Sequence, residues 1–166
     1  WSIEEYPEEW GRAQSVLGVI YSQRPVGDAE ENVRQAICYF ENSLRTLSDD
    51  RFPEGQAMVH VHLTRIYTET PPGWHADTHH KLIHHIKAAL RFYARDFNPA
   101  VWAALKSKLA EAYERLSDGD RTENLQLARA HYEDSLTVYN QEEYPNEWAA
   151  AMRGLALVYT ELPSGD

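Results

Sequence analysis

The stretch YPEEWGRAQSVLGVIYSQRPVGD, residues 6–28, returns at residues 144–166 as YPNEWAAAMRGLALVYTELPSGD. The two copies start 138 residues apart (144 − 6), which is three times 46, and the 46-residue spacing recurs between them. Proline, leucine, tyrosine and glycine each occupy one position of all four units. These positions are Pro7, Pro53, Pro99 and Pro145; Leu17, Leu63, Leu109 and Leu155; Tyr21, Tyr67, Tyr113 and Tyr159; and Gly27, Gly73, Gly119 and Gly165. A fixed period of this length is typical of a repeat protein.

Each 46-residue unit has the pattern of two helices joined by a turn. The first helix is expected to begin at the proline, because a missing N–H costs nothing at the first helical position. In the first unit the apolar residues recur at three- and four-residue steps, which places them on one face. They are Trp10, Ala13, Leu17, Ile20 and Tyr21. We expect this face to be core, together with Trp102, Trp148 and the repeated tyrosines.

The second helix carries a stripe of alternating small and large residues. The first unit has Ala36, Phe40 and Ser43, and the third unit has Ala128, Tyr132 and Ser135. Small residues allow a neighbouring helix to approach closely, and large ones fill the space beside it. No segment alternates polar and apolar residues as a strand would, so the sequence predicts an all-α fold.

A glycine followed by an aspartate marks the turn between the two helices, as in Gly27-Asp28 and Gly119-Asp120. Glycine supplies a permissive backbone, and the aspartate can accept hydrogen bonds from nearby amides. The second unit departs from this pattern, because Trp74 stands in the place of the aspartate. An exposed Trp74 would be an anchor for a partner; the alternative is that it packs on the neighbouring prolines.

One helix pair cannot bury both of its apolar faces, so stacked pairs predict a right-handed α-solenoid. We expect a single domain over residues 1–166 with about seven antiparallel helices. Its three and a half repeats span approximately residues 6–51, 52–97, 98–143 and, in part, 144–166. The last first-type helix would cover the end of the third repeat, and its other side would allow self-association through the ends.

The motif Leu17-Gly18-x-x-Tyr21, followed by Ala36-x-x-x-Phe40-x-x-Ser43, resembles the tetratricopeptide repeat (TPR) family. The usual unit of that family has about 34 residues, so this is a long variant. With Tyr/Phe-Pro-x-x-Trp and Gly-Asp-x-x-x-Asn it is similar to repeats of bacterial multi-repeat proteins, which stand beside caspase-like peptidase or signalling domains. The resemblance implies a scaffold that holds a peptide or a partner helix in a concave groove lined by the first helices.

The same resemblance implies which residues line that groove. They are Arg12, Ser15, Val19, Ser22 and Gln23 in the first unit; Met58, Val61, Arg65, Thr68 and Glu69 in the second; Ala104, Ser107, Glu111, Glu114 and Arg115 in the third; and Ala150, Arg153, Leu157, Thr160 and Glu161 in the fourth. The candidate partner-binding residues are Arg12, Arg65, Glu69, Glu111, Arg115 and Arg153. The planar guanidinium groups suit carboxylates of a partner. Alternatively, the arginines pair with nearby glutamates on a solvated surface, where ion pairs contribute little.

Composition limits the classes of partner. Sixteen basic and twenty-six acidic residues give a net charge of −10, whereas nucleic-acid binding and binding to an anionic membrane favour a basic surface. Apolar runs are too short to cross a bilayer. The single cysteine, Cys38, permits no internal disulfide and suits a reducing, cytoplasmic compartment; we expect it on a helical core face. The start at Trp1, without a signal-peptide pattern, suggests a piece of a longer protein.

Histidine is concentrated in the second unit, which holds His60, His62, His75, His79, His80, His84 and His85. His80 and His84, four residues apart on a helix, could share a metal ion. Their positions in the repeat instead favour packing, since His84 takes the place of Cys38, and no metalloprotease motif is present. We expect no metal and no cofactor. A third hypothesis is acid sensitivity near pH 5–6, because buried rings must become charged there.

No motif in the sequence supports an enzyme. A nucleophile elbow, a phosphate-binding glycine loop and a dinucleotide fingerprint are all missing. The expected function is therefore a non-catalytic protein–protein interaction scaffold that binds a protein or peptide. The alternatives are a self-assembly module of a larger signalling or peptidase protein, and a metal-binding protein that uses the histidine cluster of the second unit.

Overall fold

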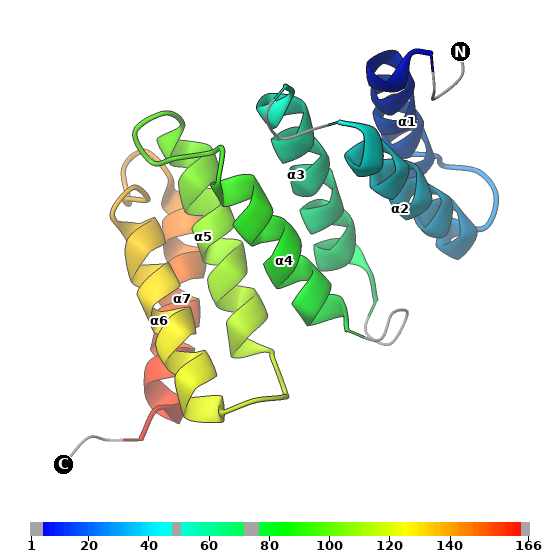
Figure 1. Ribbon diagram of the computed structural model, residues 1–166. Helices are drawn as coiled ribbons and strands as arrows, with labels where there is room; N and C mark the ends of the chain where they lie inside the picture. Colours follow the sequence, from blue (N-terminus) through cyan, green and yellow to red (C-terminus); the bar gives the residue numbers. More distant parts are fainter. Residues whose placement is uncertain (1–4, 48–50, 72–76, 164–166) are drawn as a thin grey trace. The chain divides into compact units, whose positions relative to one another are not determined.

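The computed structural model describes residues 5–47, 51–71 and 77–163, and all regular secondary structure within these ranges is helical (Figure 1). The helices are α1 (Pro7–Ser22), α2 (Ala29–Thr46), α3 (Pro53–Glu69), α4 (Thr78–Leu90), α5 (Pro99–Glu114), α6 (Arg121–Leu136) and α7 (Pro145–Glu161). The predicted all-α class, with seven helices in the described ranges, is confirmed. None of these helices has both the length and the apolar character needed to cross a membrane.

The chain folds as two compact units, Trp1–Trp74 with α1 to α3 and His75–Asp166 with α4 to α7. In the first unit α1 packs on α2, and α3 contacts both of them. In the second unit α4 packs on α5 and α5 on α6, and α7 contacts both α5 and α6. The division between the units falls inside the second predicted repeat, so the single array over residues 1–166 stays a prediction.

Proline begins the first helix of every repeat. It stands at the start of α1, α3, α5 and α7, as the 46-residue spacing predicts. The residue before it has an extended φ between −133° and −147° in all four cases. Their ψ lies between 54° and 79°, so all four lie outside the helical region, which a following proline disfavours. The four helix starts are Tyr6-Pro7, Phe52-Pro53, Asn98-Pro99 and Tyr144-Pro145.

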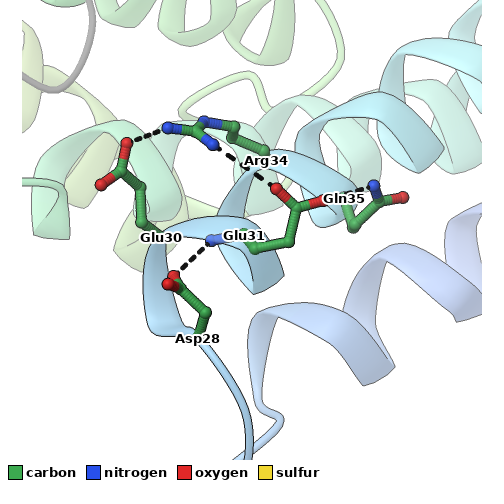
Figure 2. Close-up of polar contacts among 5 residues, drawn as sticks. All are labelled: Asp28, Glu30, Glu31, Arg34 and Gln35. Carbon is green, nitrogen blue, oxygen red and sulfur yellow. Dashed lines mark hydrogen bonds and ion pairs between the residues drawn. The ribbon is translucent and has the colours of Figure 1, made fainter.

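The start of α2 is held by a local hydrogen-bonding motif (Figure 2). The Asp28 side chain accepts a hydrogen bond of 2.9 Å from the Glu31 amide, which satisfies one free N–H of the first turn. Arg34 forms ion pairs with Glu30 and Glu31 one turn further on, and Gln35 donates to Glu31 at 2.8 Å. Upstream, Gly27 takes a φ of +91°, a conformation that favours glycine.

The start of α6 repeats this motif 92 residues later, two periods of 46. Gly119 has a φ of +81°, and the Asp120 side chain accepts from the Glu123 amide at 3.1 Å. Asn124 donates from Nδ2 to the Asp118 carbonyl at 2.8 Å. The equivalent Asn32 donates to the Val26 carbonyl at 3.0 Å. Gly-Asp-x-x-x-Asn is therefore a closed turn in both repeats.

The start of α4 lacks this motif. Its N-cap is Asp77, which has a left-handed φ of +62° and whose side chain forms no cap hydrogen bond. Thr78 occupies the position of Asn32 and Asn124. Accordingly α4 has 13 residues, against 18 in α2 and 16 in α6.

In the first and third repeats a large side chain of the second helix packs against two first helices. Phe40 of α2 is fully buried. Its ring packs against Gly18 of α1 so closely that a Cβ at Gly18 would lie only 2.8 Å from the ring. On its other side the ring stacks on His62 of α3, with centroids 5.2 Å apart. Tyr132 of α6 takes the same position in the third repeat. It packs on Gly154 of α7, and its hydroxyl donates to Glu114 of α5 at 2.8 Å.

The structure corrects the expected burial of five residues. Cys38 is exposed, and so is His84 at the same position of the next repeat, because this position faces away from both first helices. On α1, Ala13 and Ile20 are exposed rather than core. Tyr159 is 54% exposed, because α7 has no second helix of its own repeat within the described residues.

Candidate partner-binding site

A cavity of about 450 Å³ lies among α5, α6 and α7, and we call it the α5–α7 cavity. Binding sites for small ligands and short peptide segments typically enclose about 300–1,000 Å³. The cavity is lined by Ala104, Ser107, Lys108, Glu111, Glu114, Arg115, Tyr132, Tyr139, Asn146, Glu147, Ala150, Arg153, Gly154 and Leu157.

The lining contains many of the predicted groove positions. All five positions named for the third repeat lie in it, as do Ala150, Arg153 and Leu157 of the fourth. Thr160 and Glu161, the two remaining positions of the fourth repeat, lie outside it. The structure thus brings three candidate partner-binding residues, Glu111, Arg115 and Arg153, to one cavity.

Two of these three residues are already paired with each other. Glu111 accepts from Lys108 at 2.9 Å and from Arg115 at 3.0 Å, both on the same helix. The Arg115 side chain is 61% exposed, so this pair contributes little to stability. Arg115 therefore follows the alternative stated for the arginines, an ion pair with a nearby glutamate on the solvated surface.

Tyrosines form part of the cavity wall. Both Tyr132 and Tyr139 are buried. Burial and the hydrogen bond to Glu114 raise the pKa of Tyr132 far above its usual 10.0. Burial, and then the nearby Glu147 carboxylate, raise the pKa of Tyr139 to about 12. Both phenols therefore stay neutral at physiological pH and serve as a rigid apolar wall.

Arg153 differs from the other candidate arginines. It projects from α7, is exposed, and has no ion-pair partner among the described residues. Asn146 and Glu147, from the first turn of the same helix, also line the cavity. One cation, one anion and one amide in the lining are thus available to a ligand.

Two further candidates lie in the first compact unit. Arg65 donates to the Ser22 hydroxyl at 3.2 Å and lies 3.8 Å from the Glu69 carboxylate. Both charged residues line a smaller cavity of about 210 Å³, together with Ser22, Ala29, Val33, Ile66, Thr70 and Pro71. Arg12 lies in the lining of neither cavity, since its guanidinium sits over the Phe52 ring at 5.3 Å.

Sequence reasoning missed part of the cavity lining. Tyr132 was expected only in the stripe of the second helix, and Lys108, Tyr139, Asn146, Glu147 and Gly154 were not proposed for the groove. The signal for Lys108 and Gly154 was present, because each lies within one helical turn of a predicted groove position. The sequence does not indicate that the two tyrosines line the cavity, because this depends on how much of α6 is covered by α7.

The histidines of the second repeat are dispersed. The His80 ring bonds Asp118 at 2.5 Å, and this carboxylate's pKa is lowered mainly by that hydrogen bond. His84 is exposed, whereas the adjacent His85 is buried and in ring contact with it. No group of three metal-binding side chains occurs among the residues that the structure describes. His75 and Trp74 lie outside those residues, as do Gly165 and Asp166.

Comparisons of the chain with protein-family models, with curated proteins and with solved structures give no match.

Proposed function

We propose that this protein is a non-catalytic interaction scaffold with the helix stacking of a right-handed TPR-like solenoid. In this proposal the α5–α7 cavity binds a peptide. The observation that carries the proposal is the coincidence between the predicted groove positions and the cavity lining. Eight of the positions that the TPR resemblance implies for the third and fourth repeats line this one cavity, and concave surfaces are where ligands bind in helical repeat proteins.

Arg153 provides the cavity with a contact for an acidic side chain of the peptide. Arg153 is the arginine of the lining without an ion-pair partner among the described residues. A guanidinium binds a carboxylate through two parallel hydrogen bonds. The apolar wall of Tyr132, Tyr139 and Leu157 would receive a neighbouring apolar side chain.

A selection of short random peptides against the purified chain tests this function. We expect bound sequences to be enriched in Asp or Glu next to an apolar residue. Arg153→Glu should weaken a selected peptide at least about tenfold, the effect of losing one charge-assisted contact and adding a repulsive one. Arg45→Glu, an exposed arginine on α2, is the matched control and should bind normally. Equal binding of the peptide by both variants would contradict the assignment of the peptide-binding site to the α5–α7 cavity.

A further inference from the structure

One side of α1, where residues expected in the core are exposed, is an apolar surface. Ala13, Val16 and Ile20 stand at i, i+3 and i+7, so they share one face of the helix, which we call the α1 face. Val16 is 59% exposed and Ile20 is 54% exposed. β-branched apolar residues are among those most often buried, so a face of this kind needs an explanation.

Two of these three repeat positions, those of Ala13 and Ile20, are buried in every later first helix, whereas at the Val16 position His62 and Lys108 are partly exposed and only Gly154 is buried. At the position of Ala13 the exposed fractions are 0% for Val59, 4% for Leu105 and 0% for Ala151. At the position of Ile20 they are 4% for Ile66, 1% for Ala112 and 0% for Val158. The exposure is therefore specific to α1 and does not belong to the repeat itself.

The second helix of the preceding repeat is what packs against those later helices. Within the first unit α2 contacts α3, and within the second α4 contacts α5 and α6 contacts α7. The position of Val16 receives an aromatic ring in two of these contacts: Phe40 stacks on His62 at 5.2 Å, and Tyr132 packs on Gly154. The repeat thus specifies what would cover the α1 face.

A second copy of this chain does not offer that helix. The large residues at the relevant position of α2, α4 and α6 are Phe40, Ile86 and Tyr132. Their exposed fractions are 0%, 0% and 4%. Each is already buried within its own chain, so a folded copy cannot place any of them on the α1 face of another molecule.

We propose that the α1 face is a docking site for an amphipathic helix with the second-helix pattern of these repeats, Ala-x-x-x-Phe/Tyr-x-x-Ser. The incoming helix lies antiparallel to α1 and sets its aromatic ring over Val16, between Ala13 and Ile20. This site is separate from the α5–α7 cavity and does not depend on peptide binding there.

The test uses a peptide of residues 28–47, which carries the α2 pattern. Its helix is enforced by a hydrocarbon staple in place of Glu30 and Arg34, which are partly exposed in α2, and is checked by circular dichroism. Fluorescence anisotropy with the full chain should show saturable binding. The double variant Val16→Glu/Ile20→Glu should weaken it about tenfold or more, because both apolar contacts are lost. A peptide with Phe40→Ala should be weakened in the same way.

Two controls make the result decisive. Val26→Glu changes an apolar residue that is 61% exposed in the turn, and it should leave binding unchanged. Ala156→Arg changes the exposed side of α7, and it should also leave binding unchanged. Absence of saturable binding by the helical peptide overturns the proposal, as does loss of binding with Ala156→Arg but not with the α1 variant. Self-association of the chain that disappears in the α1 variant would assign the face to a second copy and overturn it too.

Discussion

Gly154 lets Tyr132 of α6 pack directly against the backbone of α7. A Cβ at this position would lie 2.3 Å from Cζ and 2.4 Å from the hydroxyl oxygen of Tyr132. The ring cannot move aside easily, since it is buried and its hydroxyl is bonded to Glu114. At the residue scale, this glycine sets how closely the last two helices approach.

Gly154→Ala should therefore destabilise the protein. Overpacking against a buried side chain typically costs about 1–3 kcal/mol, against a gain of up to about 1 kcal/mol from the helix preference of alanine. Gly55→Ala is the matched control, because a Cβ there meets Leu47 at an ordinary 3.6 Å; it should be neutral or stabilising. Urea denaturation followed by circular dichroism measures both, and equal midpoints for the two variants would contradict the packing argument.

Two half-buried histidines make stability depend on pH. The pKa of His62 is lowered from its usual 6.5 by burial and then by Arg65. The pKa of His131 is lowered by burial and then by Lys106, a shift that Asp134 partly opposes. Since the folded-state pKa lies below the unfolded-state value, the unfolded chain binds more protons in this range. Stability is therefore complete above about pH 6.5 and falls as the pH drops towards the folded-state values.

The melting temperature should accordingly be lower at pH 5.5 than at pH 7.5. His62→Gln/His131→Gln should reduce this difference, because neither group then has to become charged. His84→Gln, at an exposed position, should retain it. The hypothesis from the sequence placed the effect in the second repeat alone, whereas His131 lies in the third. A melting temperature that does not change with pH would count against both versions.

At the scale of helices, the three second helices differ in how they begin. α6 has a side-chain cap from Asp120, whereas the Asp77 side chain at the start of α4 makes no such bond. Loss of an N-cap hydrogen bond typically costs about 0.5–2 kcal/mol. These two aspartates belong to the same compact unit, so they form a natural comparison.

Asp120→Ala should lower the free energy of unfolding by about 1 kcal/mol. Asp77→Gly should instead be neutral or stabilising, because glycine adopts the φ of +62° at that position without strain. Thermal denaturation of both variants measures the contrast. Equal destabilisation would show that Asp77 also caps its helix in solution.

At the scale of the whole molecule, the contacting helices within each compact unit are either adjacent in sequence or separated by one helix. The helix contacts of α7 are with α5 and α6, and stability in a repeat array is transmitted from neighbour to neighbour. Local opening can then differ between the two compact units.

Native-state hydrogen exchange should show this gradient. Gly154→Ala is expected to speed exchange of the α5 to α7 amides more than that of the α1 and α2 amides, at equal denaturant. Gly18→Ala, whose Cβ would meet the Phe40 ring at 2.8 Å, should show the reverse order. A uniform acceleration in both variants would indicate that the chain opens only as one cooperative whole.

The sequence by itself determined the helices and their boundaries. Proline, Gly-Asp and the small–large stripe act through local backbone geometry, and local geometry recurs wherever the residues recur, at Pro7 as at Pro145. The six candidate residues came from the resemblance to the TPR family, and three of them line the α5–α7 cavity. Only the tertiary structure decided which copies of a repeat position are covered. Ile20 and Val158 share one position but differ in exposure, 54% against 0%, because burial depends on the neighbouring helix and not on the residue that is buried.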